Sequence, residues 1–161
     1  MNHIKFDNRT IKCLTELSNE INELYGFVAL KGSNFGEPAI NSGPCGPFAD
    51  LFFESWNKLF DEKVQIVFVF DKKTEECWHI LIRLPNGMFY DGGHGIHDES
   101  KYAKESFRIE DMKVYDRVIL EKNAYGLERQ YPRFCPTFSK EKVHEIINKH
   151  LLRIYKYERR A

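Results

Sequence analysis

The chain has 161 residues, of which 42% are hydrophobic and 30% charged, a composition typical of a globular domain with a core of its own. Lys plus Arg and Asp plus Glu each total 24, which argues against a general nucleic-acid or anionic-membrane binder. With no long apolar run and no signal-peptide pattern at the N-terminus, we expect a single cytoplasmic domain over residues 1–161 with no membrane partner.

The first expected element is a helix over residues 8–25, with Asp7 or Asn8 as its N-cap. Residues 27–30 predict a short strand or an extended lead-in. Residues 31–44 are rich in glycine and proline and predict a loop, a natural wall for a substrate cleft. The apolar face of the helix, to which we assign no chemistry, comprises Ile11, Leu14, Leu17, Ile21 and Leu24.

A second helix is expected from Cys45 to about residue 60 because a Gly-Pro turn precedes a helical apolar pattern. Residues 64–70 are β-branched and aromatic and predict a buried strand. Residues 75–84 and 88–91 predict two further strands. The apolar face of this helix comprises Phe48, Leu51, Phe52, Trp56 and Leu59.

The last third of the chain is expected to alternate irregular and regular segments. Residues 98–106 predict a loop or a short helix, residues 114–120 a strand, and residues 123–137 an ordered loop. Ser139 is expected to cap a final helix. The apolar face of that helix comprises Val143, Ile146, Ile147, Leu151 and Ile154.

The Pro-Asn-Gly turn at residues 85–87 determines how the second and third strands pair. Proline suits the first position of a type I turn, and glycine suits the left-handed position that follows. This three-residue loop pairs Leu84 with Met88 and therefore places His79 and Asp91 on one face, one diagonal step apart. A two-residue loop would send Asp91 to the opposite face. The proline favours the first register.

Cys45, His79 and Asp91 together form a pattern typical of a thiol nucleophile. A helix N-terminus and a nearby imidazolium lower a thiol pKa from ~8.5 toward ~4–7, which produces the reactive thiolate. His79 would supply the imidazolium. Asp91 would hold one ring nitrogen of His79 and orient the other toward the sulfur.

The surrounding residues supply candidates for substrate and oxyanion binding. The backbone N–H of Cys45, unpaired in the first helical turn, would donate to the oxyanion. A second donor is expected from the preceding loop, and Asn41 is preferred. His94 and His97 are candidates for the orienting group or for a substrate contact. The candidates in the loop are Asn34, Asn41 and Ser42.

Each residue of this pattern also has an ordinary structural alternative. Cys45 would be a small buried hydrophobe, as most free cysteines are. His79 would be a structural strand histidine, alternating with Trp78 and Ile80, which are expected to face the core. Asp91 would be a turn or cap residue before a Gly-Gly pair.

A metal or cofactor site is the remaining alternative in this stretch. There are enough ligands here for zinc, but their spacings match no compact zinc signature, and no Walker or Rossmann glycine pattern is present. These ligands are Cys45, Cys77, His79, Asp91, His94 and His97. We expect free thiols, no metal and no cofactor. The four cysteines are Cys13, Cys45, Cys77 and Cys135.

The stretch GPCGPFA…HILIRLPNGMFYDGGHG resembles the papain-like superfamily of thiol enzymes, and the resemblance covers about a third of the chain. It is similar to the transglutaminase-like and arylamine acetyltransferase-like branches and to small papain-fold toxins, some of which deamidate glutamine. Papain-type peptidases place a glutamine six residues before the nucleophile, where Ala39 stands here. The resemblance implies Cys45 as nucleophile, His79 as base and Asp91 as orienting acid.

The fold implied is α+β and papain-like, a nucleophile helix packed on a small antiparallel β-sheet with flanking N- and C-terminal helices. The function implied is a cysteine-dependent hydrolase acting on an amide bond, as a peptidase, isopeptidase or glutamine deamidase. A protein or peptide substrate is expected, and no nucleic acid. Transfer to an amine would use the same thioester. The alternative is a non-catalytic protein-binding module or inhibitor on the same fold.

Overall fold

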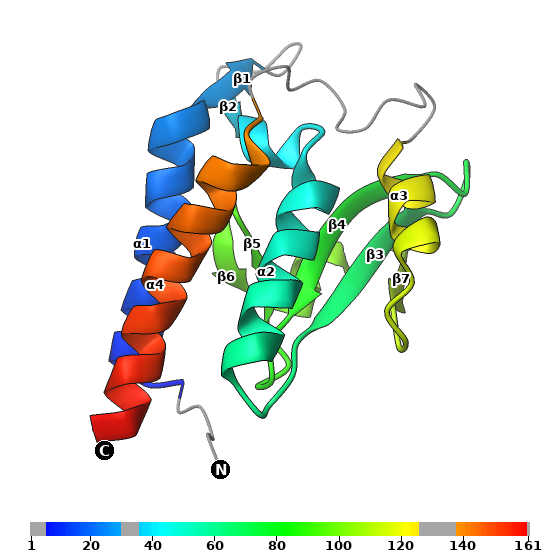
Figure 1. The fold of residues 1–161 in the computed structure, drawn as a ribbon. Coiled ribbons are helices and arrows are strands. Elements are labelled where there is room, and N and C mark those ends of the chain that lie inside the picture. Colours follow the sequence, from blue (N-terminus) through cyan, green and yellow to red (C-terminus); the bar gives the residue numbers. More distant parts are fainter. Residues whose placement is uncertain (1–5, 30–35, 126–137, 161) are drawn as a thin grey trace.

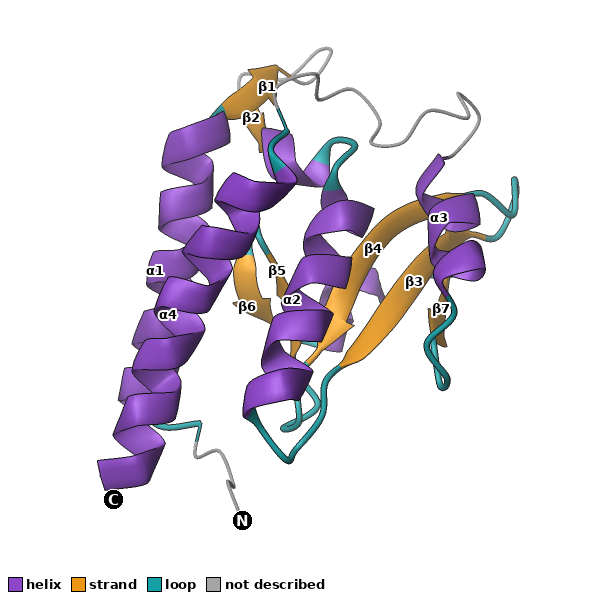
Figure 2. Ribbon diagram, viewed as in Figure 1, coloured by secondary structure: helices purple, strands orange, loops and turns teal. Residues whose placement is uncertain are grey.

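Helices cover one face of an antiparallel sheet in the computed structural model, which describes residues 6–29, 36–125 and 138–160 (Figures 1 and 2). Helix α2 packs on the sheet, and α1 and α4 pack against each other, with α4 also against α2. This confirms the expected α+β class and the flanking terminal helices. The helices are α1 (Asn8–Tyr25), α2 (Cys45–Leu59), α3 (Arg117–Tyr125) and α4 (Lys140–Arg160).

The main sheet has the strand order β6-β5-β4-β3-β7, and every neighbouring pair is antiparallel. A separate antiparallel pair, β1-β2, leads into α2 through a 3-10 turn, η1. The strands are β1 (Phe27–Ala29), β2 (Gly36–Pro38), β3 (Gln65–Asp71), β4 (Cys77–Arg83), β5 (Phe89–Asp91), β6 (Gly95–His97) and β7 (Phe107–Asp111). The 3-10 turns are η1 (Ala39–Asn41) and η2 (Glu99–Tyr102).

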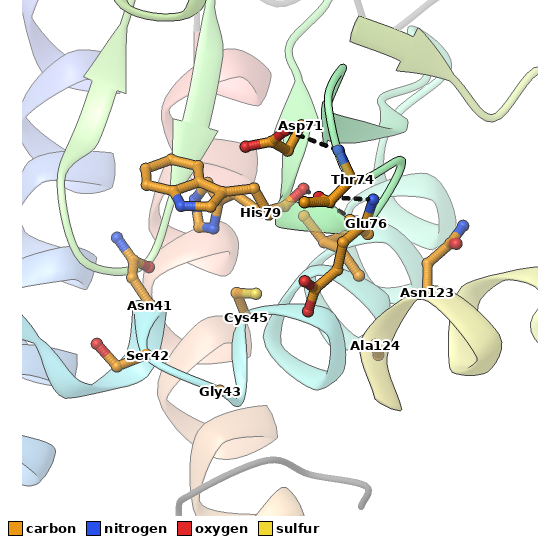
Figure 3. Close-up of a pocket in the computed structure, with 13 residues that line it drawn as sticks. Asn41, Ser42, Gly43, Cys45, Asp71, Thr74, Glu76, His79, Asn123 and Ala124 are labelled. Atoms are coloured by element: carbon orange, nitrogen blue, oxygen red, sulfur yellow. Dashed lines mark hydrogen bonds between the residues drawn. The ribbon is translucent and has the colours of Figure 1, made fainter. Parts of the chain in front are cut away.

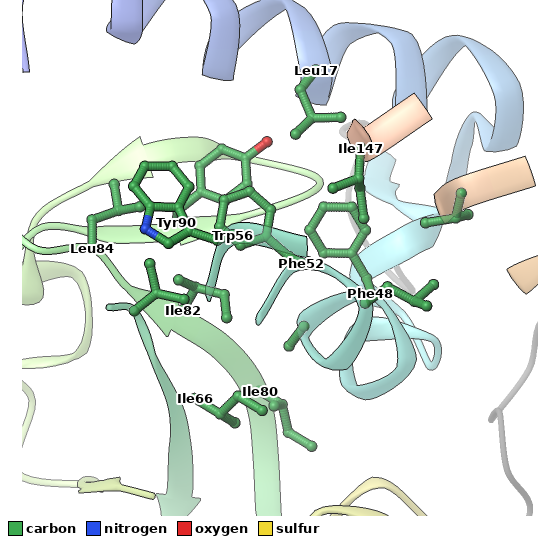
Figure 4. Close-up of a cluster of buried hydrophobic side chains, with 14 of the residues drawn as sticks. Leu17, Phe48, Phe52, Trp56, Ile66, Ile80, Ile82, Leu84, Tyr90 and Ile147 are labelled. Atoms are coloured by element: carbon green, nitrogen blue, oxygen red, sulfur yellow. The ribbon is translucent and has the colours of Figure 1, made fainter. Parts of the chain in front are cut away.

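The core between the helices and the sheet is rich in aromatic side chains (Figure 4). The ring of Phe52 lies 5.7 Å from that of Trp56 and 4.9 Å from that of Tyr90, measured between centroids. The Tyr90 hydroxyl is 2.9 Å from the Ser18 hydroxyl and donates to the Leu14 carbonyl at 3.2 Å. Strand β5 is therefore held to α1 by polar contacts as well as by packing.

The opposite face of the sheet carries a smaller buried cluster beneath η2. Tyr102, from η2, packs there on side chains of β3, β4 and β5. His79 and Asp91 are on this side of the sheet, since their strand neighbours Leu81 and Phe89 belong to the cluster. The buried members of the cluster are Val67, Val69, Leu81, Phe89 and Tyr102.

The expected helix signals are largely confirmed. The Asp7 side chain caps α1 by accepting from the N–H groups of Arg9 and Thr10. The Ser139 hydroxyl accepts from the Lys142 N–H at 3.2 Å at the start of α4. All five expected apolar residues of α4 are buried, whereas Ile11 and Leu24 of α1 are largely exposed.

The prediction of a strand over residues 114–120 is wrong. The strand is β7, Phe107–Asp111, whose partly buried Phe107 and Ile109 alternate with exposed residues along the edge of the sheet. The chain then forms α3, because the Asp116 carboxylate caps the N–H groups that start the helix. The exposed β-branched side chains that suggested a strand are Val114 and Val118, 82% and 76% exposed.

Two further expectations need correction. The segment expected to be loop over residues 31–44 contains β2 and η1, while residues 31–35 lie outside the described residues. The expected loop over residues 123–137 begins inside α3, and residues 126–137 lie outside the described residues. Among the described helices, none combines the length and apolarity that a bilayer crossing requires.

Candidate active site

Cys45 is the first residue of α2 and borders a cavity of about 370 Å³ (Figure 3). Gly43, with φ of 134°, and Pro44, the N-cap, turn the chain into the helix. The Phe48 N–H donates to the Pro44 carbonyl at 3.0 Å, which starts the helical ladder. The N–H groups of Cys45 and Gly46 precede this bond and therefore have no acceptor within the helix. The Cys45 thiol is partly buried.

Close packing at Gly46 brings the N-terminus of α2 against strand β4. A Cβ at this position would lie 2.7 Å from the Ala124 Cβ and 3.2 Å from the Ile80 Cδ1. Only a glycine permits α3, α2 and β4 to approach this closely. As a result the Ile80 backbone reaches the Cys45 sulfur with a hydrogen bond.

A β-bulge in β4 lies directly before His79. His79 pairs with Val69, but Cys77 pairs with Phe70, so Trp78 is the extra residue. The Trp78 side chain is 57% exposed, which corrects the expectation that it faces the core. His79 is only 5% exposed, and its Nε2 lies 3.3 Å from Oδ2 of Asp91. That contact leaves Nδ1 as the nitrogen available to the Cys45 thiol.

The hairpin register predicted from the turn is confirmed. Ile82 pairs with Tyr90, the Leu84 N–H donates to the Met88 carbonyl at 2.8 Å, and Gly87 has φ of 87°. The side chains of Asp91 and His79 consequently share one face. The sequence places them within reach of each other by turn chemistry alone.

Asp91 is 2% exposed, and both of its carboxylate oxygens have partners. Its Oδ1 accepts from the Asn41 side-chain amide at 2.9 Å, from the Gly93 N–H at 3.1 Å and from the His94 N–H at 2.6 Å. Its Oδ2 faces His79. Asp91 is therefore a turn residue and at the same time the partner of His79, and its role as the orienting acid stays a prediction.

These contacts shift three pKa values. Burial alone would raise the pKa of the Cys45 thiol, but hydrogen bonding to His79 and the charge of His79 lower it below its ordinary value. Burial acts to lower the pKa of His79, yet Asp91 and then Cys45 raise it to about 10. Burial also acts to raise the pKa of Asp91, and His79 holds it well below the usual range. The contacts therefore favour a thiolate beside an imidazolium over the pair of neutral groups.

The other residues expected in the site lie around this trio. Asn41 donates to Asp91, and its role as an oxyanion donor stays a prediction. The Ser42 hydroxyl donates to the Pro38 carbonyl at 3.3 Å. The His94 Nε2 lies 3.0 Å from the Glu37 carboxylate. Asn34 lies outside the described residues.

A second cavity, of about 420 Å³, is also lined by His79. It shares four lining residues with the first cavity, among them the exposed Trp78. Sequence reasoning missed Trp78 and Tyr102, because strict strand alternation hides a bulge and η2 is distant in the chain. The shared residues are Asn41, Ser42, Trp78 and His79.

His97, one of the two further histidines considered, also lies beside the acid. Its Nε2 is 3.8 Å from Oδ2 of Asp91, and its Nδ1 is 3.1 Å from the Gly95 carbonyl. Burial lowers the pKa of His97, so this ring is neutral at neutral pH. Asp91 therefore faces one imidazolium, on His79.

Within residues 6–29, 36–125 and 138–160, no three or more His, Cys, Asp or Glu side chains are grouped so as to hold a metal ion. Comparisons with protein-family models, with curated proteins and with solved structures found no match to this chain. The functional argument consequently depends on the geometry of the site itself.

Proposed function

We propose that the protein is a cysteine-dependent hydrolase of amide bonds, with Cys45 as nucleophile, His79 as base and acid, and Asp91 as the orienting carboxylate. The observation that carries the proposal is the buried Asp91–His79 pair next to a helix-terminal thiol with a lowered pKa. The protein also resembles the papain-like thiol enzymes in its arrangement, with a cysteine on a helix and a histidine and an aspartate on adjacent strands. The described cysteines form no disulfide, which supports action in the reducing cytoplasm.

The proposed reaction has two steps. The Cys45 thiolate attacks the amide carbonyl carbon, the C–N bond breaks, and Nδ1 of His79 gives its proton to the leaving amine. Water then attacks the thioester while His79 takes a proton from it, and the C–S bond breaks to restore the thiolate. The net reaction is hydrolysis of an amide to a carboxylic acid and an amine. The same chemistry serves a peptidase, an isopeptidase or a glutamine deamidase.

Backbone N–H groups at the start of α2 would stabilise the oxyanion that forms on the substrate carbonyl. The Cys45 and Gly46 N–H groups are unpaired by helix geometry and lie next to the sulfur in sequence. Asn41 adds a side-chain amide whose second N–H is not used by Asp91. Two cavities that share His79 in their lining support a protein or peptide substrate that extends past the bond being cleaved.

The pH dependence of Cys45 alkylation by iodoacetamide tests this proposal. In the wild type we expect fast labelling that begins below the free-thiol range and stays level up to about pH 10, where His79 loses its proton. In His79→Ala, burial of the thiol is no longer opposed, so its pKa rises. The labelling rate near pH 6 should then fall about tenfold or more.

Three further variants make the measurement specific. Cys45→Ser identifies the labelled residue, because any labelling that persists in this variant comes from one of the other three cysteines of the chain. His79→Gln repeats the test with a side chain that still hydrogen-bonds Asp91. His144→Gln, in α4, is the matched control and should label like the wild type. A wild-type Cys45 that labels slowly and titrates like a free thiol contradicts the proposal and favours a non-catalytic binding module.

A further inference from the structure

The described charged side chains that line the Cys45 cavity, apart from His79, are both acidic. Asp71 ends β3, and Glu76 immediately precedes β4. Figure 3 shows the Glu76 side chain directed toward the space between Cys45 and Ala124. Two carboxylate residues of the described chain therefore line the cavity that holds the nucleophile.

The position of Asp71 is fixed by the turn that joins β3 to β4. Its Oδ1 accepts from the Lys73 N–H at 2.8 Å and from the Thr74 N–H at 3.1 Å. The lysines of this turn, Lys72 and Lys73, are exposed and are not among the residues lining the cavity. The carboxylate is held at the cavity, whereas the cations of the same turn are in solvent.

The exposed indole of Trp78 adds an aromatic surface to the same cavity. Its ring packs on Phe107, at 5.1 Å between centroids, and meets Tyr102 at 6.2 Å edge to face. It is held in place by these contacts and yet is 57% exposed. An ordered aromatic face beside carboxylates is the chemistry that binds ammonium and guanidinium groups.

We propose that the Cys45 cavity receives a basic side chain of a polypeptide substrate, a lysine or an arginine next to the amide bond that is cleaved. The Asp71 and Glu76 carboxylates attract the cation, and Trp78 contacts it. An acidic side chain at the same place is repelled. This inference rests on the proposed function, since it names the substrate class of that same site.

Two methanethiosulfonate reagents test the charge preference without a known substrate. Each forms a mixed disulfide when the thiolate attacks its sulfur and expels methanesulfinate; one carries a trimethylammonioethyl group and the other a sulfonatoethyl group. In the wild type at low ionic strength, Cys45 should react faster with the cation than with the anion. The ratio of the two rates should decrease in Asp71→Asn and Glu76→Gln by about two- to threefold each, and by about fivefold or more in the double variant.

The control variants distinguish the effect of charge in the cavity from a change in the reactivity of the Cys45 thiol. Glu54→Gln removes an exposed carboxylate of α2 that pairs with Lys58 and does not line the cavity, so its rate ratio should equal that of the wild type. Trp78→Leu should slow the cationic reagent alone by about threefold, while Trp78→Phe retains most of the rate. Because loss of a carboxylate near the thiol also changes the thiol pKa, the rate with neutral iodoacetamide is measured in every variant, and the rate with each charged reagent is divided by it.

The outcomes distinguish this inference from the proposed function. If iodoacetamide labels Cys45 quickly but the rate ratio is the same in wild type and double variant, the cationic substrate class is wrong and the thiol enzyme stands. If iodoacetamide labels the wild-type Cys45 slowly, the proposed function fails and this inference fails with it. A ratio that falls with each carboxylate removed supports the inference.

Discussion

At the residue scale, the carboxylate of Asp91 is the most constrained group in the site. One oxygen accepts three N–H groups, and the other faces the His79 ring. A buried carboxylate with this many donors stays ionised and cannot rotate without losing several charge-assisted hydrogen bonds. It therefore fixes both the orientation and the protonation of His79.

Replacement of Asp91 by asparagine removes the negative charge of the side chain and retains its shape, so it tests the effect of the charge alone. Asp91→Asn retains an oxygen for the Gly93 and His94 N–H groups but removes the anion beside His79. We expect the pKa of His79 to fall and the labelling rate of Cys45 near pH 6 to drop about tenfold, because a buried imidazolium is no longer compensated. Alkylation kinetics over pH measure this effect.

The matched control for this variant is Asp98→Asn. Asp98 also caps backbone, since its Oδ1 accepts from the Ser100 N–H at 2.9 Å, but it lies outside both cavities at the site. Its labelling profile should equal that of the wild type. Equal profiles for both aspartate variants would mean that Asp91 serves only the turn.

At the scale of elements, the site depends on helix α1, to which the sequence assigns no chemistry. The Ser18 hydroxyl donates to the Asp91 carbonyl at 3.2 Å, and the Asn22 side chain donates to the Gly93 carbonyl at 3.0 Å. These bonds hold the end of β5 and the turn after it. Polar residues on an amphipathic helix give no sign of such partners in the sequence, because the partners lie about seventy positions further along the chain.

The turn after β5 also packs tightly on η1, so a side chain at Gly93 would test whether Asn41 influences the site. A Cβ there would lie 2.5 Å from Asn41 Nδ2 and 2.5 Å from Pro38 Cβ. Gly93→Ala should therefore push Asn41 away from Asp91, destabilise the fold by about 1–3 kcal/mol and move the onset of Cys45 labelling to higher pH. Denaturant unfolding and alkylation kinetics measure the two effects.

Gly87→Ala is the matched glycine control. Gly87 also requires a special conformation, with φ of 87°, but a Cβ there would meet nothing within 4 Å. This variant should lose about 1 kcal/mol of stability through backbone strain and leave the labelling profile unchanged. A Gly93→Ala profile that matches the wild type would show that Asn41 does not influence the site.

For the whole molecule, the sequence predicts the elements with strong periodicity and the pairing that a specific turn dictates. Helices α1, α2 and α4 and strands β3 to β5 lie close to where the apolar pattern places them, and the His79–Asp91 contact follows from the 85–87 turn. The sequence does not predict strand β7, because the β-branched residues at 114–120 give a stronger strand signal than the alternating pattern at 107–111. Tertiary context overrides propensity there, since α3 packs through the buried Leu120 and Ala124.

The parts that the sequence could not predict arise from contacts across the fold. The bulge at Trp78 adds one residue on β4 without any glycine or proline to mark it. Tyr102 joins the site from η2, and Asp71 and Glu76 join it from the ends of a hairpin turn. Each of these positions depends on how β3, β4 and β7 align, which periodicity alone does not determine.

The thiolate–imidazolium pair should also appear in the pH dependence of global stability. The ordinary pKa values are 9.0 for the thiol and 6.5 for the imidazole. Between these values the unfolded chain holds one proton, on Cys45, and the folded protein in the proposed thiolate–imidazolium form also holds one, on His79. Equal proton binding means that the pair contributes no slope to the free energy of unfolding in this window.

In Cys45→Ser we expect the free energy of unfolding to depend on pH in this window, because the thiol no longer offsets the proton on His79. Without the thiol, folded His79 still holds a proton because of Asp91, whereas unfolded His79 loses it above 6.5. The folded state then binds one proton more, so the free energy of unfolding should fall with rising pH by up to about 1.4 kcal/mol per pH unit. Urea unfolding across this window, with Cys45→Ser/His79→Gln as the reference for all other groups, measures the difference. Identical slopes in wild type and Cys45→Ser would show that the folded site holds a neutral thiol, because only a thiolate cancels the proton on His79.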